Sequence, residues 1–332
     1  MILAAGFGTR LFPLTIDRTK PAIPFLGKPL VGYVAEYVAR FGFKEVVVNL
    51  HHQPESVKNA LGSGAEFGVK IHYTEETPKI LGTAGALDNA RHLLEDETFL
   101  IVNGKIITDI DIAAALETHK KSGALATMVL MRNYKRERFT IVETENDLVR
   151  GFGDFPAPLT LEQIGNLDTI PPSPLMFTGI HILEPGVFDY IPRNVYSDIV
   201  PTFYNPAIKN GEKIVAHVAD GNWFELSTIP RYLDISLAML DGQTEKIVRG
   251  ENVRISSGAM VKDSVIWDDV SIGEGAELYR TIIADGVRIA PGERFENAAI
   301  VRAEMLSHCE EIPAKALKGF VQGENYVVPL NQ

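Results

Sequence analysis

The sequence predicts an α/β protein built in two parts: a mostly parallel sheet with helices on both faces, and a short parallel β-helix that follows it. Two observations carry this prediction. Apolar strands alternate with amphipathic helices through the first part of the chain, as in successive βαβ units. In the last part, valine, isoleucine and glycine recur at a fixed step of seventeen residues, as in stacked coils. We therefore expect two domains, over residues 1–242 and 243–332.

Composition limits the kinds of partner that this chain can have. Its 332 residues carry a formal charge of −11, and no block dense in lysine or arginine offsets this acidity, which argues against nucleic acid or an anionic membrane as a partner. The single cysteine, Cys309, excludes an internal disulfide and suits a reducing compartment. No apolar run approaches a membrane span, and the opening residues lack the basic segment of a signal peptide. We expect a cytoplasmic protein.

Residues 1–131 contain the alternation of strands and helices in its clearest form. Strands are expected at 2–5, 45–50, 69–74, 99–102 and 124–131, with helices at 29–42, 54–61, 82–94 and 111–122. This pattern is Rossmann-like, and in such sheets ligands lie across the carboxyl ends of the strands. His51 and His52 follow one strand without partner ligands at metal-binding spacing, so we interpret them as loop or packing residues.

A β-rich segment follows the alternating part. Strands are expected at 139–143, 148–152 and 176–183, then helices within 197–210, a strand at 213–218 and a helix at 230–240. The proline-rich excursion over 156–174 is interpreted as a mobile loop over the site or as a contact with a partner.

The tail contains the seventeen-residue repeat. Val253, Val270 and Val287 keep this step, and glycines at 258, 275 and 292 keep it at the corners. The repeat resembles the left-handed β-helix of hexapeptide-repeat proteins, with about three coils that lean on the first domain or on another subunit. Some proteins with such a domain are acyltransferases, but no histidine lies within these repeats. We therefore expect a structural module that joins subunits into a homo-oligomer.

The opening stretch has the layout of a phosphate-binding loop. A short strand runs into Gly6 and Gly8, then Thr9 and Arg10, with Lys20 ten residues further on. Glycines let backbone N–H groups approach an anion, and a guanidinium with an ammonium neutralises a triphosphate. A dinucleotide fingerprint would need a third glycine at position 11, and a P-loop would need Gly-Lys-Ser/Thr, so neither motif fits.

This stretch resembles the signature of the sugar-1-phosphate nucleotidylyltransferases, or NDP-sugar pyrophosphorylases, which reads G-x-G-T-R-L-x-P-L-T followed by K-P. The matching residues are Gly6, Gly8, Thr9, Arg10, Leu11, Pro13, Leu14, Thr15, Lys20 and Pro21. The chain is similar to mannose-1-phosphate guanylyltransferases and glucose-1-phosphate nucleotidylyltransferases. The resemblance implies that Arg10 and Lys20 are catalytic. It also implies nucleotide-binding roles for Leu3, Ala5, Gly6, Gly8, Thr9, Glu75, Gly82, Thr83, Asn103 and Gly104.

Glu75 bears on which base is bound. In the resembled family the stretch around residues 75–87 holds the base, and a carboxylate acceptor at Glu75 would suit the paired N–H donors of guanine. The alternative is that Glu75 belongs to a solvated acidic turn before a helix. The sequence leaves the base open.

The chain departs from the family pattern where a metal and a sugar phosphate are expected. The family holds Mg²⁺ with aspartates in N-G-D and W-x-D, where this chain has Lys105 and Glu225. A lysine cannot ligate Mg²⁺, whereas Glu225 can. Phe155 replaces the lysine that contacts the sugar phosphate. The resemblance leaves Thr140, Asp154 and Gly179 as the sugar-binding positions.

Two interpretations follow. In one, the protein is a transferase that converts a nucleoside triphosphate and a sugar-1-phosphate into an NDP-sugar and pyrophosphate, with the Lys105 ammonium replacing part of the charge of Mg²⁺. In the other, it is a catalytically impaired relative that binds nucleotide or NDP-sugar as a regulatory or assembly subunit, possibly with an active paralogue.

Overall fold

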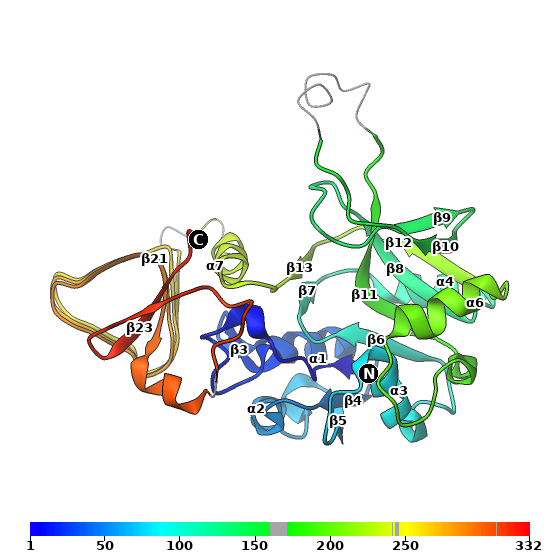
Figure 1. The fold of residues 1–332 in the computed structure, drawn as a ribbon, viewed down its shortest axis with the longest axis horizontal. Helices are drawn as coiled ribbons and strands as arrows, with labels where there is room; N and C mark the ends of the chain where they lie inside the picture. Colours follow the sequence, from blue (N-terminus) through cyan, green and yellow to red (C-terminus); the bar gives the residue numbers. More distant parts are fainter. Residues whose placement is uncertain (160–170, 241, 243–245, 310) are drawn as a thin grey trace.

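The computed structural model describes residues 1–159, 171–240, 242, 246–309 and 311–332 (Figure 1). It contains a large mixed sheet with helices on both sides and, beside it, a stack of short parallel strands that ends near the C-terminus. The proline-rich excursion expected over 156–174 falls largely on residues 160–170, which lie outside the described residues. No helix of the described chain combines the length and apolar character that crossing a bilayer requires.

The central sheet has nine strands in the order β5-β4-β1-β6-β11-β8-β12-β10-β9. Their bounds are β1 (Ile2–Leu3), β4 (Glu45–Leu50), β5 (Lys70–Glu75), β6 (Phe99–Asn103), β8 (Ala126–Arg132), β9 (Val142–Glu145), β10 (Leu148–Phe152), β11 (Leu175–Leu183) and β12 (Ile214–Val218). Strands β5, β4, β1 and β6 are parallel, whereas β11 runs antiparallel between β6 and β8. The predicted α/β class is confirmed, and β11 joins the two halves of the sheet.

The two faces of the sheet bury different sets of helices. One face packs against α1 (Leu30–Arg40), α2 (Pro54–Leu61) and α4 (Ile112–Ser122), and the other against α3 (Gly82–Asn89), the π-helical turn η7 (Val200–Tyr204) and α6 (Asn205–Lys209). Alternate residues of one strand enter the two cores: Val46 and Val48 of β4 join the first, and Val47 joins the second. This is the period of two that a strand buried on both sides requires.

Three elements differ from their expected form. The helix expected over 82–94 ends at Asn89, and a 3₁₀ turn, η4 (Arg91–Leu93), follows, because glycine, aspartate and asparagine make α3 a weak helix former. Pro201 and Pro206 each remove an N–H donor from the 197–210 segment, which forms a π turn followed by α6. The strand expected from residue 139 starts at Val142, because the Asn133 side chain bonds the backbone N–H and carbonyl of Glu137 and holds a turn there.

Shorter strands and one helix complete the first part of the fold. They are β2 (Pro24–Phe25), β3 (Lys28–Pro29), β7 (Ile106–Thr108), β13 (Trp223–Glu225) and α7 (Ile229–Ala238). Antiparallel pairing of β13 with β7 sets Glu225 opposite Ile106, next to Lys105.

The tail forms the predicted parallel coils. Its strands are β14 (Ile247–Arg249), β15 (Arg254–Ile255), β16 (Met260–Lys262), β17 (Ser264–Ile266), β18 (Ser271–Ile272), β19 (Glu277–Ile283), β20 (Arg288–Ile289) and β21 (Arg294–Arg302). Every coil-to-coil pairing joins residues seventeen apart, such as Val265 with Ile282 and Leu278 with Phe295. The sequence repeat is therefore the step of the coil. An antiparallel hairpin of β22 (Phe320–Gln322) and β23 (Asn325–Pro329), which the sequence did not reveal, closes the stack on β21.

The coils share a hydrophobic core with the first part of the chain. Leu11 and Leu14, from the loop after β1, are buried in one cluster with Trp267 and Val328 of the tail. The Trp267 indole N–H donates to the Tyr232 hydroxyl of α7 at 3.0 Å, and that hydroxyl donates to the Pro24 carbonyl at 2.6 Å. One chain of hydrogen bonds thus joins a coil, α7 and the start of β2. Strand β2 directly follows the signature loop, which we define as residues 6–21.

An ion pair crosses the same interface. Arg18 of the signature loop contacts Asp285 of the tail at 2.6 Å, and its guanidinium lies 5.2 Å from the centre of the Trp267 ring. The coils pack against the first domain of the same chain, which is one of the two arrangements expected from the sequence.

We expect Trp267→Ala to lower the free energy of unfolding by about 3 to 5 kcal/mol, because it empties a buried site and removes the bond to Tyr232. Since both parts share this core, chemical denaturation followed by circular dichroism should still give one transition, at a lower midpoint. Met260→Ala, on an exposed coil position, is the matched control and should change the free energy of unfolding by no more than about 0.5 kcal/mol. Two separate transitions, with the first domain unaffected by Trp267→Ala, would contradict the shared core.

Candidate nucleotide-binding site

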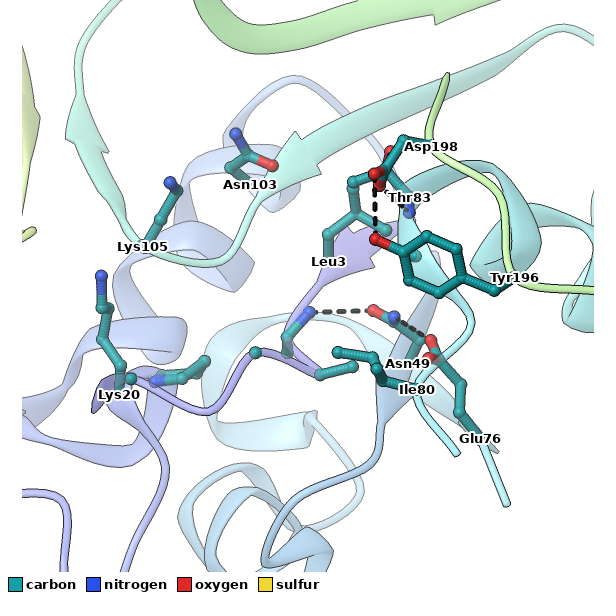
Figure 2. Close-up of a pocket in the computed structure, with 16 residues that line it drawn as sticks. Leu3, Lys20, Asn49, Glu76, Ile80, Thr83, Asn103, Lys105, Tyr196 and Asp198 are labelled. Carbon is teal, nitrogen blue, oxygen red and sulfur yellow. Dashed lines mark hydrogen bonds between the residues drawn. The ribbon is translucent and has the colours of Figure 1, made fainter. Parts of the chain in front are cut away.

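A cavity of about 410 Å³ opens at the carboxyl ends of β1, β4, β5 and β6. Figure 2 shows Lys20 and Lys105 at one end of it and Glu76 and Tyr196 at the other. The lining residues are Leu3, Ala4, Ala5, Gly6, Gly8, Lys20, Pro21, Asn49, Glu76, Ile80, Gly82, Thr83, Asn103, Lys105, Tyr196 and Asp198. This is the edge of the sheet at which the parallel topology predicts a ligand.

The two glycines of the signature loop have different tasks. Gly8 adopts φ +67°, and a Cβ there would lie 3.1 Å from the Cβ of Lys20, so this position needs glycine for both conformation and space. A Cβ on Gly6 would meet nothing within 4 Å. Gly6 therefore leaves its backbone open toward the cavity, whereas Gly8 lets the loop close on Lys20.

Asn49 and Glu76 tie three strand ends together beneath the cavity. The Ala4 N–H donates to Asn49 Oδ1 at 2.8 Å, and Asn49 Nδ2 donates to Glu76 Oε1 at 2.6 Å. The Leu81 N–H donates to the other oxygen, Glu76 Oε2, at 2.6 Å. Glu76 is only 1% exposed, and burial raises the pKa of its carboxyl against the effect of these hydrogen bonds.

Glu75, which the sequence analysis assigned to the base, lies outside the cavity. Its exposed carboxylate pairs with Lys58 at 2.6 Å. The neighbouring Glu76 faces the cavity, because successive residues of an extended chain point to opposite sides. Glu75 is the last residue of β5 and is held in an ion pair, so Glu76, and not Glu75, lines the cavity.

The segment 196–198 covers the first turn of α3. The N–H of Ala84 donates to the Ser197 carbonyl at 2.8 Å, and Asp198 accepts from the N–H of Thr83 at 3.3 Å. Gly82 has φ +75°, and a Cβ there would lie 2.6 Å from the Ser197 carbonyl. Gly82 and Thr83 line the cavity as expected, but their helix end is already bonded to this segment.

Positive charge gathers at the other end of the cavity. Lys20 is 8% exposed, and its ammonium has no hydrogen-bond partner among the described residues. Lys105 also faces the cavity and forms an ion pair with the carboxylate of Glu225, which is buried. Arg10 is exposed, makes no ion pair with any described residue and does not line the cavity, although its charge acts on both Lys20 and Glu225.

This charge pattern shifts two pKa values. Burial, together with the charges of Lys105 and Arg10, lowers the pKa of Lys20 to about 7, against the attraction of Glu225. Burial alone would raise the pKa of Glu225, but Lys105, Lys20 and Arg10 outweigh it, and the pKa lies below its usual range. Lys20 is therefore a buried amine that gains from an added negative charge.

Asn103 and its two glycine neighbours form the wall between the two ends. A Cβ on Gly104 would lie 2.9 Å from the Leu3 carbonyl, so Gly104 lets β6 close against β1. Gly179 has φ +81°, and a Cβ there would lie 2.1 Å from Asn103 Nδ2. Gly179 is thus required for the packing of Asn103, and it does not itself line the cavity.

The other proposed sugar residues lie apart from this cavity. Thr140 and Asp154 are exposed. Beside them, the Phe139 ring contacts Trp223, with ring centres 5.3 Å apart, and both rings line a second cavity of about 510 Å³. Thr9 and Glu225 are also absent from the lining of the first cavity.

Sequence reasoning missed Asn49, Tyr196 and Asp198. Asn49 had a signal, because it is a polar residue inside an otherwise apolar strand. No local pattern marked Tyr196 and Asp198. Asp198 accepts hydrogen bonds from Tyr196 and from Thr83, and Thr83 lies more than a hundred residues earlier in the chain. His51 and His52 pack around the ring of Phe7, in agreement with the packing interpretation.

Comparison with known proteins identifies the fold. The family model for nucleotidyl transferases matches residues 1–242, and the model for a GlmU-like C-terminal hexapeptide domain matches residues 235–297. The chain belongs to the nucleotidyl transferase family. Its tail is accordingly a left-handed β-helix.

The names of the relatives of this chain specify different nucleotides. The chain is 29% identical over 287 residues to a UTP–glucose-1-phosphate uridylyltransferase of Synechocystis, covering 82% of this chain and 71% of that one. It is 29% identical over 281 residues to mannose-1-phosphate guanylyltransferase 1 of Arabidopsis thaliana, covering 82% and 72%. A solved structure from Bacillus anthracis, assigned to the glucose-1-phosphate thymidylyltransferases and holding sucrose, matches with a TM-score of 0.59 at 22% identity, over 73% of this chain and 95% of that one.

The expected Mg²⁺ site does not fit the residues of this chain. Lys105 occupies one of the two ligand positions, and its ammonium holds the carboxylate of the other, Glu225. Across the described residues, no three histidine, cysteine, aspartate or glutamate side chains come together as metal ligands. The pair supplies at most one oxygen-ligand side chain where hard Mg²⁺ needs several oxygens.

We expect Lys20→Met to stabilise the protein in a pH-dependent way. The pKa of Lys20 falls from 10.5 to about 7 on folding, so between these values the unfolded chain binds more protons and stability rises with pH. The free energy of unfolding that is lost because folded Lys20 must be charged is largest below pH 7 and decreases to zero toward pH 10.5. The advantage of Lys20→Met over the wild type should therefore shrink by about 2 kcal/mol between pH 7 and pH 9.

Urea denaturation of both proteins at the two pH values measures this difference. Lys44→Met, which removes an exposed lysine, is the control and should follow the wild type at both pH values. A Lys20→Met protein that is less stable than the wild type at pH 7 would show that the Lys20 ammonium is already paired.

Proposed function

We propose that this protein transfers the nucleotidyl group of a nucleoside triphosphate to a sugar-1-phosphate, forming an NDP-sugar and releasing pyrophosphate. The observation that carries the proposal is the buried, unpaired ammonium of Lys20 at the carboxyl edge of a parallel sheet, behind the glycines of the signature loop. A triphosphate supplies the negative charge that this amine lacks. Membership of the nucleotidyl transferase family and the names of its relatives support the same reaction.

The reaction needs positioning and charge neutralisation. An anionic phosphate oxygen of the sugar-1-phosphate attacks the α-phosphorus, and the bond from that phosphorus to the oxygen bridging to the β-phosphorus breaks. The electron pair stays on the departing pyrophosphate. Lys20 and Lys105 face the cavity beside the signature loop, and Arg10, whose charge acts on Lys20, adds a third cation outside the lining. These groups stabilise the charge that grows on pyrophosphate.

The impaired-subunit alternative is less well supported. The glycines, Lys20 and the base end of the cavity are all present, and the family match spans residues 1–242. The altered residues are Lys105 and Glu225 of the metal pair and the sugar-side positions, and Glu225 keeps a carboxylate. We propose homo-oligomerisation through the β-helix as well, on the basis of the GlmU-like match to residues 235–297.

We propose guanine as the base, with Glu76 as its acceptor. Guanine carries two N–H donors on one edge, and a carboxylate offers two oxygens for them, whereas uracil and thymine present one N–H between two carbonyls. Glu76 lines the cavity at the end away from Lys20 (Figure 2). Its two oxygens are held in place by Asn49 and by the N–H of Leu81.

Pyrophosphate release tests the reaction and the base together. GTP, UTP, dTTP, ATP and CTP are each offered with mannose-1-phosphate and glucose-1-phosphate, and we expect the highest kcat/KM with GTP. Glu76→Gln should reduce the preference for GTP over UTP by roughly tenfold or more, because a charge-assisted hydrogen bond contributes about 1.5 to 3 kcal/mol.

Glu75→Gln is the matched control and should keep the wild-type preference, because Glu75 faces away from the cavity. The preference is a ratio, so a general loss of stability in Glu76→Gln does not imitate the expected effect. A higher kcat/KM with another base would refute guanine, and the absence of release with every pair would refute the transferase.

A further inference from the structure

We propose that the Lys105–Glu225 ion pair takes the place of a protein-bound divalent cation, so that the site binds polyphosphate with its own ammonium groups. The inference rests on the proposed function, because it assigns the charge that the same site uses. It starts from the disagreement between this pair of residues and a Mg²⁺ site.

The charges balance at these two positions. Two aspartates and one divalent cation, the arrangement implied by the resemblance, have zero net charge. Lys105 and Glu225 also have zero net charge. Exchanging one aspartate for lysine adds two positive charges, which equals the charge of the cation that is no longer held. The net charge at these two positions is thereby kept with no metal bound.

The backbone fixes the pair. Strand β13 pairs with β7 so that Glu225 lies opposite Ile106, and the Leu226 N–H donates to the Lys105 carbonyl at 3.2 Å. Arg231 Nε donates to the Glu225 carbonyl at 2.7 Å and holds the end of β13. Lys105 and Glu225 are therefore set against each other by a two-stranded ladder, and the pair is not a chance contact of mobile side chains.

Lys105 has capacity for a ligand. An ammonium group has three donors, and the carboxylate of Glu225 is the acceptor that the described residues offer it. Its side chain is 36% exposed and lines the cavity, whereas the side chain of Glu225 is 9% exposed. The Glu225 carboxylate is therefore buried in the protein, and the Lys105 ammonium faces the cavity, where a phosphate can contact it.

Lys20 adds a second ammonium. It lines the same end of the cavity, and Figure 2 shows Lys20 and Lys105 next to each other there, with their side chains pointing in the same direction. The two amines repel each other. A polyphosphate oxygen between them would relieve that repulsion, so the ligand gains affinity from both.

Calorimetric titration with inorganic tripolyphosphate, which carries the phosphates without a base, tests the proposal. Each titration is done once in EDTA and once with excess Mg²⁺. We expect the wild-type Kd to agree within about threefold between the two conditions. Lys105→Met should weaken binding by roughly tenfold or more in both, since a charge-assisted contact is lost.

Lys105→Asp is the decisive variant, because it restores a pair of carboxylates. It should bind tripolyphosphate weakly in EDTA and recover when Mg²⁺ or Mn²⁺ is added. Electron paramagnetic resonance should then detect protein-bound Mn²⁺ in Lys105→Asp and not in the wild type. Lys79→Met removes an exposed lysine outside the cavity lining and should keep the wild-type Kd.

A double variant guards against misfolding. Lys105→Met with Glu225→Gln removes both charges, leaves no unpaired buried carboxylate, and should keep the wild-type Tm while binding as weakly as Lys105→Met. Wild-type binding that requires Mg²⁺, bound Mn²⁺ in the wild type, or no binding of tripolyphosphate at all would overturn the inference.

The outcomes for the proposed transferase function and for the ion-pair inference can be told apart. Pyrophosphate release that depends on Mg²⁺ in the wild type would refute the inference and leave the transferase assignment in place. Metal-independent binding of tripolyphosphate without any release would refute the transferase assignment and leave the ion-pair inference in place.

Discussion

The structure depends on the packing of the signature loop, which has one buried apolar side and one polar side that lines the cavity. One side of the loop carries Leu11 and Leu14 into the core that the β-helix shares with α7. The other side presents Gly6, Gly8 and Lys20 to the cavity. Because the apolar side is fixed by packing, the polar side is held in place without a ligand, which is what an anion site needs if binding is not to cost loop ordering.

Because of this packing, the β-helix also stabilises the region around the signature loop, in addition to any role in assembly. The Arg18–Asp285 pair connects the coils to the signature loop, and the bonds from Trp267 to Tyr232 and from Tyr232 to the Pro24 carbonyl connect them to β2, which follows it. The coils thereby support the loop from behind. The binding side is costly in return: Lys20 is buried among like charges, and its charged form is unfavourable until an anion arrives.

Much of this could be read from the sequence, for reasons that are local. Strands with β-branched runs and the seventeen-residue repeat depend on neighbours in the chain, and both appeared where they were expected. The loop motif located Gly8 and Lys20 for the same reason. What could not be read depends on distant contacts. Glu75 and Glu76 differ only in the side of the chain that they face, and Asp198 reaches Thr83 through a fold that no local pattern records.

The changed residues illustrate the same limit. The sequence indicated that Lys105 cannot ligate a metal, but only the pairing of β13 with β7 brings its ammonium to Glu225. Likewise, Gly179 matched a sugar-binding position, whereas in the structure its missing side chain makes room for Asn103. A motif therefore predicts which residues gather at a site better than it predicts which atoms each residue contacts.

A crystal structure of the protein with α,β-methylene-GTP, which cannot release pyrophosphate, tests the central claim most directly. The account predicts phosphate oxygens within hydrogen-bonding distance of both Lys20 Nζ and Lys105 Nζ, beside the glycines of the signature loop, with the base at the Glu76 end of the cavity. An analogue bound elsewhere, with Lys20 turned toward a carboxylate of the protein, would contradict it.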